Sequence, residues 1–230
     1  MTEHIAITAR NVTLTLGRTE ILRGVTLDVP DGQSLAILGP SGSGKSSLMA
    51  ILSGLERASS GEVRVAGVDF SALDEDGLAR ARRGRIGIVL QSFHLLPTMT
   101  ALENVATPLE LAGRADAFAR AAEELEAVGL GHRIDHYPAQ LSGGEQQRVA
   151  IARAVAPGPR ILFADEPTGN LDGRTSDAIV DLLFTRRRAA GATLVMITHD
   201  RALAERCDRV VEMRDGLIAS DRPAERRPAA

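Results

Sequence analysis

The sequence lacks tryptophan, has a single tyrosine (Tyr137) and contains only 3% aromatic residues. Proteins that bind single-stranded nucleic acids usually stack the bases on aromatic side chains, so no such stacking surface is expected. The formal net charge is −3. The chain therefore also lacks the excess of positive charge that is typical of nucleic-acid-binding domains. We expect no nucleic acid partner.

Cysteine and long apolar runs are also scarce. Cys207 is the only cysteine, which excludes an internal disulfide and a cysteine-rich metal cluster. No stretch approaches the roughly 20 apolar residues of a membrane-spanning helix, and the first residues do not resemble a signal peptide. We therefore expect a soluble, cytoplasmic protein that reaches a membrane only through a partner.

Lysine is nearly absent as well. Of the 27 basic residues, Lys45 is the only lysine and the other 26 are arginines. An ammonium group is compact, whereas a guanidinium group is planar and wider. The position of this lysine therefore indicates a site that accepts a small cation and excludes arginine.

Lys45 lies in a stretch with the spacing of a phosphate-binding loop, G-x-x-x-x-G-K-[ST]. An apolar run that predicts a strand precedes it, and a predicted helix follows. Glycines let backbone N–H groups surround an anion, the helix N-terminus adds positive charge, and the Ser46 hydroxyl can ligate Mg²⁺. A glycine- and serine-rich surface turn is the alternative interpretation. The expected phosphate contacts are Gly39, Pro40, Ser41, Gly42, Ser43, Gly44, Lys45, Ser46 and Ser47.

The distribution of apolar residues predicts an α/β fold. Three apolar runs, at residues 86–90, 160–164 and 192–198, are typical of buried parallel strands. Predicted helices alternate with them, which is the pattern of the α/β class. Alternating apolar and polar residues at 5–16 and 25–29 predict antiparallel strands.

The middle and the end of the chain differ from this pattern. Residues 92–157 show no strand pattern and predict a helical insertion in the core. Residues 209–213 and 217–220 predict a closing hairpin. The proline-, arginine- and alanine-rich residues 221–230 predict a disordered tail. We expect residues 1–220 to form a single domain.

Polar residues follow the three buried strands: Gln91, the pair Asp165 and Glu166, and His199. Ligands bind at the carboxyl ends of strands in such sheets, so we expect these side chains above the phosphate loop. Asp165 is suited to a magnesium ion. Glu166 points to the opposite side and is placed to orient and deprotonate the water that attacks the γ-phosphate. The alternative interpretation for Asp165 and Glu166 is that they only cap a helix. The alternative for His199 is a residue in a solvated loop.

A second anion-binding helix start is predicted at residues 141–148, Leu-Ser-Gly-Gly-Glu-Gln-Gln-Arg. Ser142 and Glu145 have the spacing of a capping box, and capping alone is the ordinary interpretation. However, Gly143 and Gly144 leave the helix N-terminus open to an anion. One nucleotide needs one such cradle from its own subunit. We therefore expect the second cradle to close on the nucleotide of another copy, in a head-to-tail dimer with two sites.

The five stretches together resemble the motifs of ABC-transporter ATPase subunits. In order and spacing, they are similar to the Walker A, Q-loop, signature, Walker B and switch-histidine motifs, over nearly the whole chain. The resemblance implies a P-loop NTPase with a RecA-like core, an antiparallel β subdomain and an inserted α-helical subdomain. It implies a Mg²⁺-dependent ATPase whose two copies sandwich two ATP molecules. It also implies a separate integral-membrane permease, which holds the chain on the cytoplasmic face of the inner membrane.

The resemblance assigns roles to single residues. Asp172 belongs to a segment similar to the D-loop, which crosses the dimer interface. The implied catalytic residues are Lys45, Gln91, Glu166 and His199, and the implied metal ligands are Ser46, Gln91 and Asp165. Beyond the phosphate loop, the implied ATP contacts are Gln91, Leu141, Ser142, Gly143, Gly144, Glu145, Asp172 and His199.

Within the family, residues 96–105 and 164–172 resemble the lipoprotein-release and macrolide-export group, LolD and MacB. Residues 139–140, 181–184 and 206–209 are most similar to the YbbA branch. This implies export, or transmission of motion across the membrane.

Two features concern nucleotide and partner selection. Leu16 stands where family members usually carry an aromatic residue that stacks on adenine, so we expect weak discrimination between ATP and GTP.

Apolar residues follow Gln91, namely Phe93, Leu95, Leu96 and Met99. They belong either to the core or to a groove for a cytoplasmic helix of the permease, and the border of the helical insertion favours the groove.

Three other functions fit the sequence less well. ABC ATPases of DNA repair or the ribosome have long coiled-coil insertions or two fused cassettes, and this sequence has neither. An ATP-binding regulator without turnover would not need Glu166 and His199. A P-loop kinase would need an acceptor site and would leave residues 141–148 unexplained.

Overall fold

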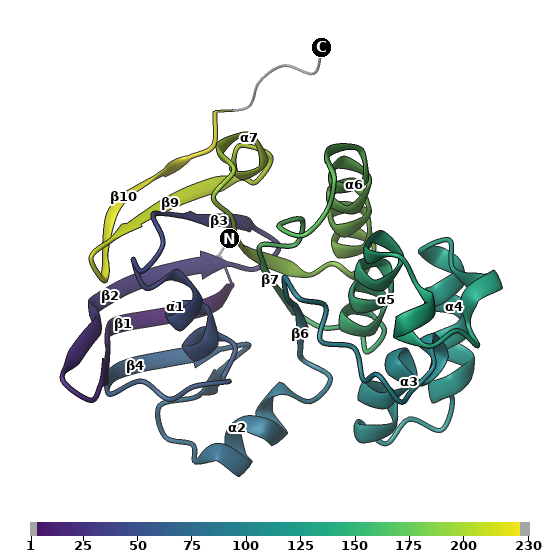
Figure 1. Ribbon diagram of the computed structural model, residues 1–230. Coiled ribbons are helices and arrows are strands. Elements are labelled where there is room, and N and C mark those ends of the chain that lie inside the picture. The colour runs from purple at the N-terminus through teal and green to yellow at the C-terminus, as the bar shows by residue number, and fades with distance from the viewer. Residues whose placement is uncertain (1–3, 226–230) are drawn as a thin grey trace. The chain divides into compact units, whose positions relative to one another are not determined.

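The computed structural model describes residues 4–225, except the side chain of Arg174, and divides into two compact units (Figure 1). The first unit contains residues 4–82 and 193–225. The second unit is Arg83–Ala192.

An antiparallel sheet forms one part of the first unit. Its strands are β1 (Ile5–Leu16), β2 (Thr19–Pro30), β4 (Ser60–Val65) and β5 (Val68–Asp69), in the order β2-β1-β4-β5. The antiparallel strands predicted at residues 5–16 and 25–29 are confirmed, but β2 begins six residues earlier than expected. Leu16 already pairs with Thr19, because backbone groups of both strands hydrogen-bond up to a tight turn.

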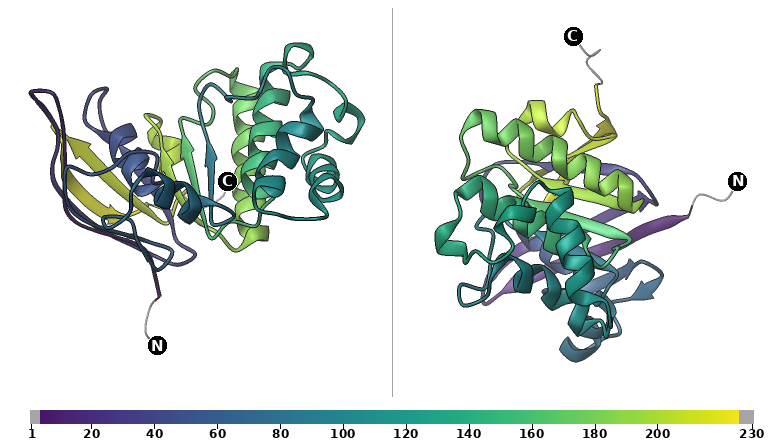
Figure 2. Two further views of the ribbon diagram at one scale, coloured as in Figure 1. Left: turned by 90° about the horizontal axis from the view of Figure 1, so that it is seen from below. Right: turned by 90° about the vertical axis from the view of Figure 1, so that its right-hand side faces the viewer.

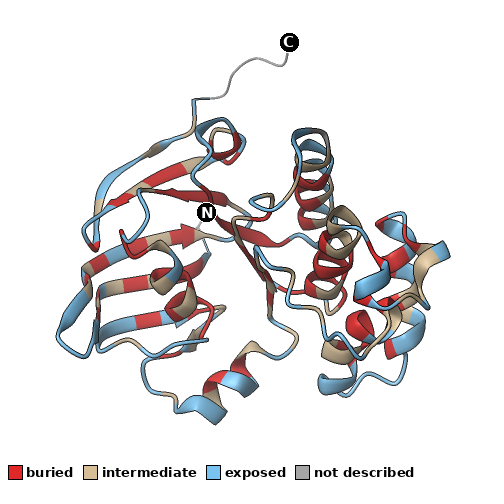
Figure 3. Ribbon diagram, in the orientation of Figure 1, coloured by how far each residue is buried: buried red, intermediate tan, exposed pale blue. Residues whose placement is uncertain are grey.

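The other strands of the first unit are β3 (Ser34–Leu38), β8 (Thr193–Ile197), β9 (Arg209–Arg214) and β10 (Leu217–Pro223). They follow the order β10-β9-β3-β8, and β3 runs parallel to both neighbours. All residues of β3 and β8 are buried, as their apolar runs predicted, and β3 is red in Figure 3. The helices of this unit are α1 (Lys45–Leu52), α2 (Glu75–Arg82) and α7 (Arg201–Ala204).

The end of β10 corrects the prediction for the C-terminal tail. Asp221 pairs with Val211 in the ladder between β9 and β10, and Arg209 Nε donates to Asp221 Oδ1 at 2.6 Å. Pairing and charge outweigh the disorder that composition predicted for residues 221–223. Of the predicted tail, residues 226–230 lie outside the described residues.

The second unit combines two parallel strands with helices. Its strands are β6 (Ile86–Val89) and β7 (Ile161–Asp165), and its helices are α3 (Ala101–Leu111), α4 (Ala117–Ala127), α5 (Gly143–Val155) and α6 (Gly173–Ala190). Short 3-10 turns, η1 (Gly131–Arg133) and η2 (Pro138–Gln140), connect α4 to α5. The segment 92–157 is helical without strands, as expected. Both views of Figure 2 show its teal helices beside the green helices.

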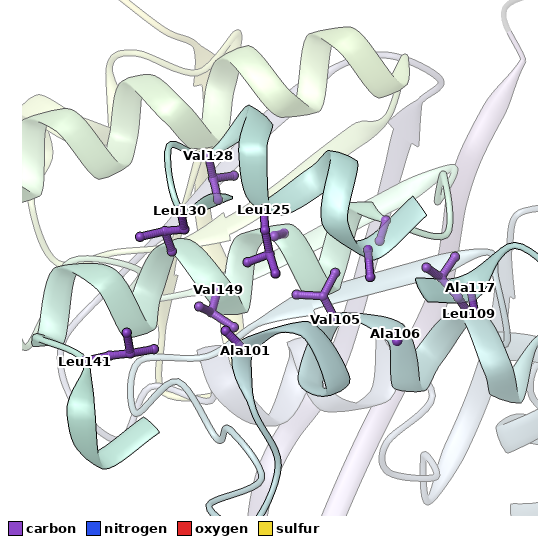
Figure 4. Packing of buried hydrophobic residues seen from close by; sticks show 13 residues of the cluster. Ala101, Val105, Ala106, Leu109, Ala117, Leu125, Val128, Leu130, Leu141 and Val149 are labelled. Atoms are coloured by element: carbon purple, nitrogen blue, oxygen red, sulfur yellow. The ribbon is translucent and has the colours of Figure 1, made fainter. Parts of the chain in front are cut away.

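An apolar cluster holds α3, α4 and α5 together (Figure 4). Leu109 of α3, Leu125 of α4 and Val149 of α5 are fully buried in it. Burial of each such side chain contributes about 1.5–3 kcal/mol. The cluster therefore fixes the helix that begins with the sequence Ser-Gly-Gly-Glu. Among the described residues, no helix combines the length and apolar character that crossing a bilayer would require.

Candidate functional site

The loop between β3 and α1 has a backbone that requires glycine. Gly39 and Gly44 have φ angles of 150° and 96°. A Cβ atom on Gly39 would lie 2.3 Å from the carbonyl oxygen of Met213, and one on Gly44 would lie 2.8 Å from Cδ2 of Leu22. Backbone contact therefore excludes a side chain at Gly39, and the positive φ angle disfavours one at Gly44.

The N-terminus of α1 is suited to an anion. Gly44 is its N-cap, no side chain in the described part of the chain caps it, and its first turn contains no acidic residue. The first backbone N–H groups of a helix have no acceptor within the helix, and the helix dipole adds positive charge at this end. A bound phosphate would accept hydrogen bonds from these N–H groups and would be attracted by the positive end of the dipole.

Lys45 is held over this loop. Its Nζ atom donates to the carbonyl oxygens of Gly39 and Pro40, each at 2.8 Å. Two carbonyls at this distance hold a compact ammonium group directly at the mouth of the loop. The loop, the uncapped helix and Lys45 together fit the phosphates of a nucleotide.

His199 lies near the same loop. It follows β8, and β8 pairs in parallel with β3, which precedes the loop. His199, Gly39 and Pro40 line one cavity of about 490 Å³. The predicted proximity of His199 to the phosphate loop is therefore confirmed within the first unit.

In the second unit, Gln91 contacts the segment that follows β7. Nδ2 of Asn170 donates to the backbone oxygen of Gln91 at 3.1 Å, and Nε2 of Gln91 lies 3.4 Å from Oδ1 of Asn170. A Cβ atom on Gly169 would lie 2.7 Å from Gln91 Nε2. Glycine at position 169 therefore leaves room for the end of the Gln91 side chain, a contact that sequence reasoning missed.

Asp165 and Glu166 lie at the end of β7. Asp165 is its last residue, and Glu166 adopts a φ angle of 45°, which is uncommon outside glycine. The acids do not cap α6, because its N-cap is Asp172, whose Oδ1 accepts from Thr175 N at 3.1 Å. This removes the helix-cap interpretation for the pair. Asp172 itself is thus a structural cap, in addition to its predicted contact with ATP.

Helix α5 begins with the predicted capping box. Oγ of Ser142 accepts from Glu145 N at 3.3 Å, and Glu145 Oε2 accepts from Ser142 N at 2.8 Å. Glu145 Oε2 also accepts from the hydroxyl of Ser142 at 2.8 Å. The two bonds to the carboxylate, first that from the backbone N–H of Ser142 and then that from its hydroxyl, lower the pKa of Glu145 below its ordinary value. The carboxylate therefore stays ionised at neutral pH. The helix itself offers no acceptor to the N–H groups of Gly143 and Gly144, so an anion can bind them.

The predicted magnesium ligands are distributed over both units. Ser46 is in the first unit, and Gln91 and Asp165 are in the second. A hydroxyl, an amide oxygen and a carboxylate form the oxygen-donor set that Mg²⁺ accepts. Placement of Gln91, Asp165 and Glu166 above the phosphate loop stays a prediction.

Comparison with known proteins decides the family. A profile of the ABC transporter family matches residues 22–169. The chain belongs to the ABC transporter family. It is 53% identical over 203 residues to the uncharacterized ABC transporter ATP-binding protein YbbA of Escherichia coli K12, covering 87% of this chain and 89% of YbbA. The lipoprotein-releasing system ATP-binding protein LolD 2 of Caulobacter vibrioides is 52% identical over 208 residues, covering 90% of this chain and 91% of LolD 2.

Further relatives of this ABC protein confirm the group and the fold. The macrolide export ATP-binding/permease protein MacB of Chlorobium luteolum is 52% identical over 206 residues, covering 89% of this chain but 31% of MacB. Among solved structures, the ATP-binding cassette MJ0796, in a dimeric post-hydrolysis state bound to ADP and Pi, superposes with a TM-score of 0.87. It is 38% identical and covers 96% of this chain and 100% of that one. The ABC ATPase fold and the likeness to LolD, MacB and YbbA are thus confirmed.

Proposed function

We propose that this chain is the ATP-hydrolysing subunit of an ABC transporter and that it drives a separate membrane permease. The family match and the dimeric ADP-bound cassette support ATP binding and hydrolysis. The observation that carries the proposal is the uncapped N-terminus of α1 with Lys45 held over the glycine loop.

The proposed site residues act as follows. Lys45 binds the terminal phosphates, and Glu166 orients and deprotonates the attacking water. His199 and Gln91 hold the γ-phosphate and that water. Ser46, Gln91 and Asp165 would ligate Mg²⁺, which neutralises charge on the phosphate oxygens when it is bound.

The second cradle, at Ser142–Gly144, would bind the nucleotide of another copy. The dimeric state of the related cassette supports a homodimer. Each γ-phosphate would then lie between Lys45 of one protomer and the glycines of its partner. The segment that contains Asp172 would lie at this dimer interface.

Complementation tests the shared site. In a Glu166→Gln background, Lys45→Ala removes one cradle and Gly143→Glu blocks the other. A Cβ atom on Gly143 would come no closer than 3.4 Å to Leu171, so this variant is expected to fold. Each variant alone should remain monomeric with MgATP in size-exclusion chromatography with light scattering. The mixture should form a heterodimer with one ATP. Two cradles that acted within one chain would leave the mixture monomeric.

We also propose a permease partner and a membrane location, which the related transporter proteins support. LolD belongs to a lipoprotein-releasing system, and MacB is a macrolide export protein. We propose that this chain, like those proteins, serves export or mechanical transmission. It would lie on the cytoplasmic face of the inner membrane through its permease. Co-purification from detergent-solubilised membranes discriminates this from a non-transport ABC ATPase, which would bring ribosomes or DNA instead of a permease.

The apolar segment after Gln91 is proposed as the permease contact. Leu96 is 41% exposed. Phe93 and His94 have φ angles of 62° and 47°, and their carbonyl oxygens each accept from Arg153 of α5 at 2.7 Å. Helix α5 therefore holds this loop in a defined and strained shape, which favours recognition by a partner.

Phe93→Glu with Leu96→Glu should abolish stimulation of the ATPase by the permease while basal turnover is retained. Charged side chains cannot be buried against an apolar helix without a large desolvation cost. Pull-down of the permease and its stimulation of ATP hydrolysis measure the effect. Leu111→Glu is a matched control, since Leu111 is 62% exposed on α3. Unchanged pull-down by the double variant would contradict the proposal.

Leu16→Tyr should strengthen binding of ATP relative to GTP. Leu16 is 55% exposed at the end of β1, so an aromatic ring can be added there without disturbing the core. Stacking of a base on an aromatic ring is worth about 1–3 kcal/mol. Calorimetric titration with both nucleotides measures the difference, and Leu111→Tyr is the control. A strong preference of the wild-type chain for ATP over GTP would contradict the role of Leu16.

A further inference from the structure

Gln147 is a buried polar residue inside the helix that starts with the second cradle. Its side chain in α5 is fully buried, and its Nε2 atom donates to the carbonyl oxygen of Pro167 at 2.7 Å. Its Oε1 atom is also buried, and it has no hydrogen-bond partner among the described residues. Half of this buried amide is therefore satisfied, by a residue next to Glu166.

Packing alone does not explain a glutamine at this position. A buried acceptor without a donor destabilises the folded state, and an apolar side chain of similar size would avoid that cost. An unsatisfied buried group calls for a specific reason. The bond to Pro167 supplies a candidate reason, because Glu166 directly precedes this proline.

Glu166 has a backbone that needs support. Its φ angle of 45° is unfavourable for a residue with a side chain, and the following proline further restricts it toward extended conformations. Residues in such regions persist only where their surroundings hold them, and they cluster at active sites. The turn is closed on one side by Gly169 N, which donates to Glu166 O at 3.0 Å. Gln147 holds the next carbonyl along the chain.

The same face of α5 packs on this segment at two more positions. A Cβ atom on Gly143 would lie 3.4 Å from Leu171, and one on Gly144 would lie 2.6 Å from Thr175. Positions 143, 144 and 147 share one helix face, because residues three and four apart are neighbours on a helix. The start of α5 therefore contacts the segment from Pro167 to Thr175 along its length.

We infer that Gln147 is a positioning residue, which holds the strained backbone at Glu166 and ties it to the start of α5. The inference rests on the proposed role of Glu166 in hydrolysis. Engagement of a phosphate by Gly143 and Gly144 then acts on the same helix that fixes Glu166. Glu166 is therefore correctly placed only when α5 is in position.

The test compares kcat with nucleotide affinity. Gln147→Met keeps the volume and removes the donor. It should lower kcat at least tenfold and leave the dissociation constant for ATP within twofold, because the hydrogen bond that it loses is to Pro167 and not to a proposed phosphate contact. In a Glu166→Gln background, measured by single turnover, Gln147→Met should slow hydrolysis no further. An equal loss in both backgrounds would overturn the inference.

Gln147→Glu adds a pH readout. A buried carboxyl group favours its neutral form, which can donate to Pro167 O as the glutamine does. Its kcat, relative to that of the wild type, should therefore rise as the pH falls. A ratio that does not change with pH would overturn the inference, since a merely structural defect has no reason to follow this titration.

Asn104→Leu is the matched control. Asn104 is also a fully buried amide of the second unit, and its Nδ2 donates to the carbonyl oxygens of Leu96, Met99 and Thr100. The Asn104→Leu variant should have a lower melting temperature, but its kcat, measured below that temperature, should equal that of the wild type. If Gln147→Met has a normal kcat while Glu166→Gln is inactive, the inference about Gln147 is overturned and the proposed function is not. Full turnover in Glu166→Gln overturns the proposed function and the inference with it.

Discussion

Glu166→Gln should bind ATP as the wild type does and hydrolyse it at least about 100-fold more slowly, since a positioned general base contributes roughly 10²–10⁴ in rate. The substitution keeps the size of the side chain and removes only its ability to accept a proton. The backbone at residue 166 is left-handed in both proteins, because the substitution does not change the branching at Cβ.

The same variant should accumulate a dimer. If ATP bound between two protomers drives closure and hydrolysis reopens them, blocking hydrolysis leaves the closed state. Size-exclusion chromatography with MgATP detects it, and steady-state phosphate release measures the turnover. Glu123→Gln is the control, since this acid is exposed on α4. Normal turnover in Glu166→Gln would remove the residue from the proposed role.

Lys45→Ala should weaken ATP binding about 10- to 150-fold. The loss corresponds to a charge-assisted hydrogen bond of about 1.5–3 kcal/mol, at 1.4 kcal/mol per factor of ten. Lys45→Arg should fail nearly as completely, although it retains the charge. The ammonium group lies 2.8 Å from each of two carbonyl oxygens, and a planar guanidinium cannot occupy that position without displacing the loop.

The Lys45→Arg result separates shape from charge. Titration of each variant with a fluorescent ATP analogue, or by calorimetry, measures the affinity. Arg57→Lys is the reciprocal control at an exposed position, and it should bind ATP normally. Wild-type affinity in Lys45→Arg would show that position 45 requires only a positive charge. It would also remove the physical explanation for the single lysine.

Local patterns predicted most of the elements. Apolar runs marked the buried strands β3 and β8, and the Ser142–Glu145 spacing marked the start of α5, because each depends on residues a few positions apart. Composition failed at Asp221, where an ion pair with Arg209 and strand pairing extend β10. No local pattern reveals those partners.

The sequence by itself determined the family and the fold class and predicted the residues proposed to bind phosphate, because the motif spacings encode helix starts and strand ends directly. Only the tertiary structure decided how these residues are held. Gln147 meets Pro167 across 20 positions, and Asn170 meets Gln91 across 79. The reason is physical: a hydrogen bond between residues far apart in the sequence depends on how whole helices and strands pack. No local sequence pattern contains that information.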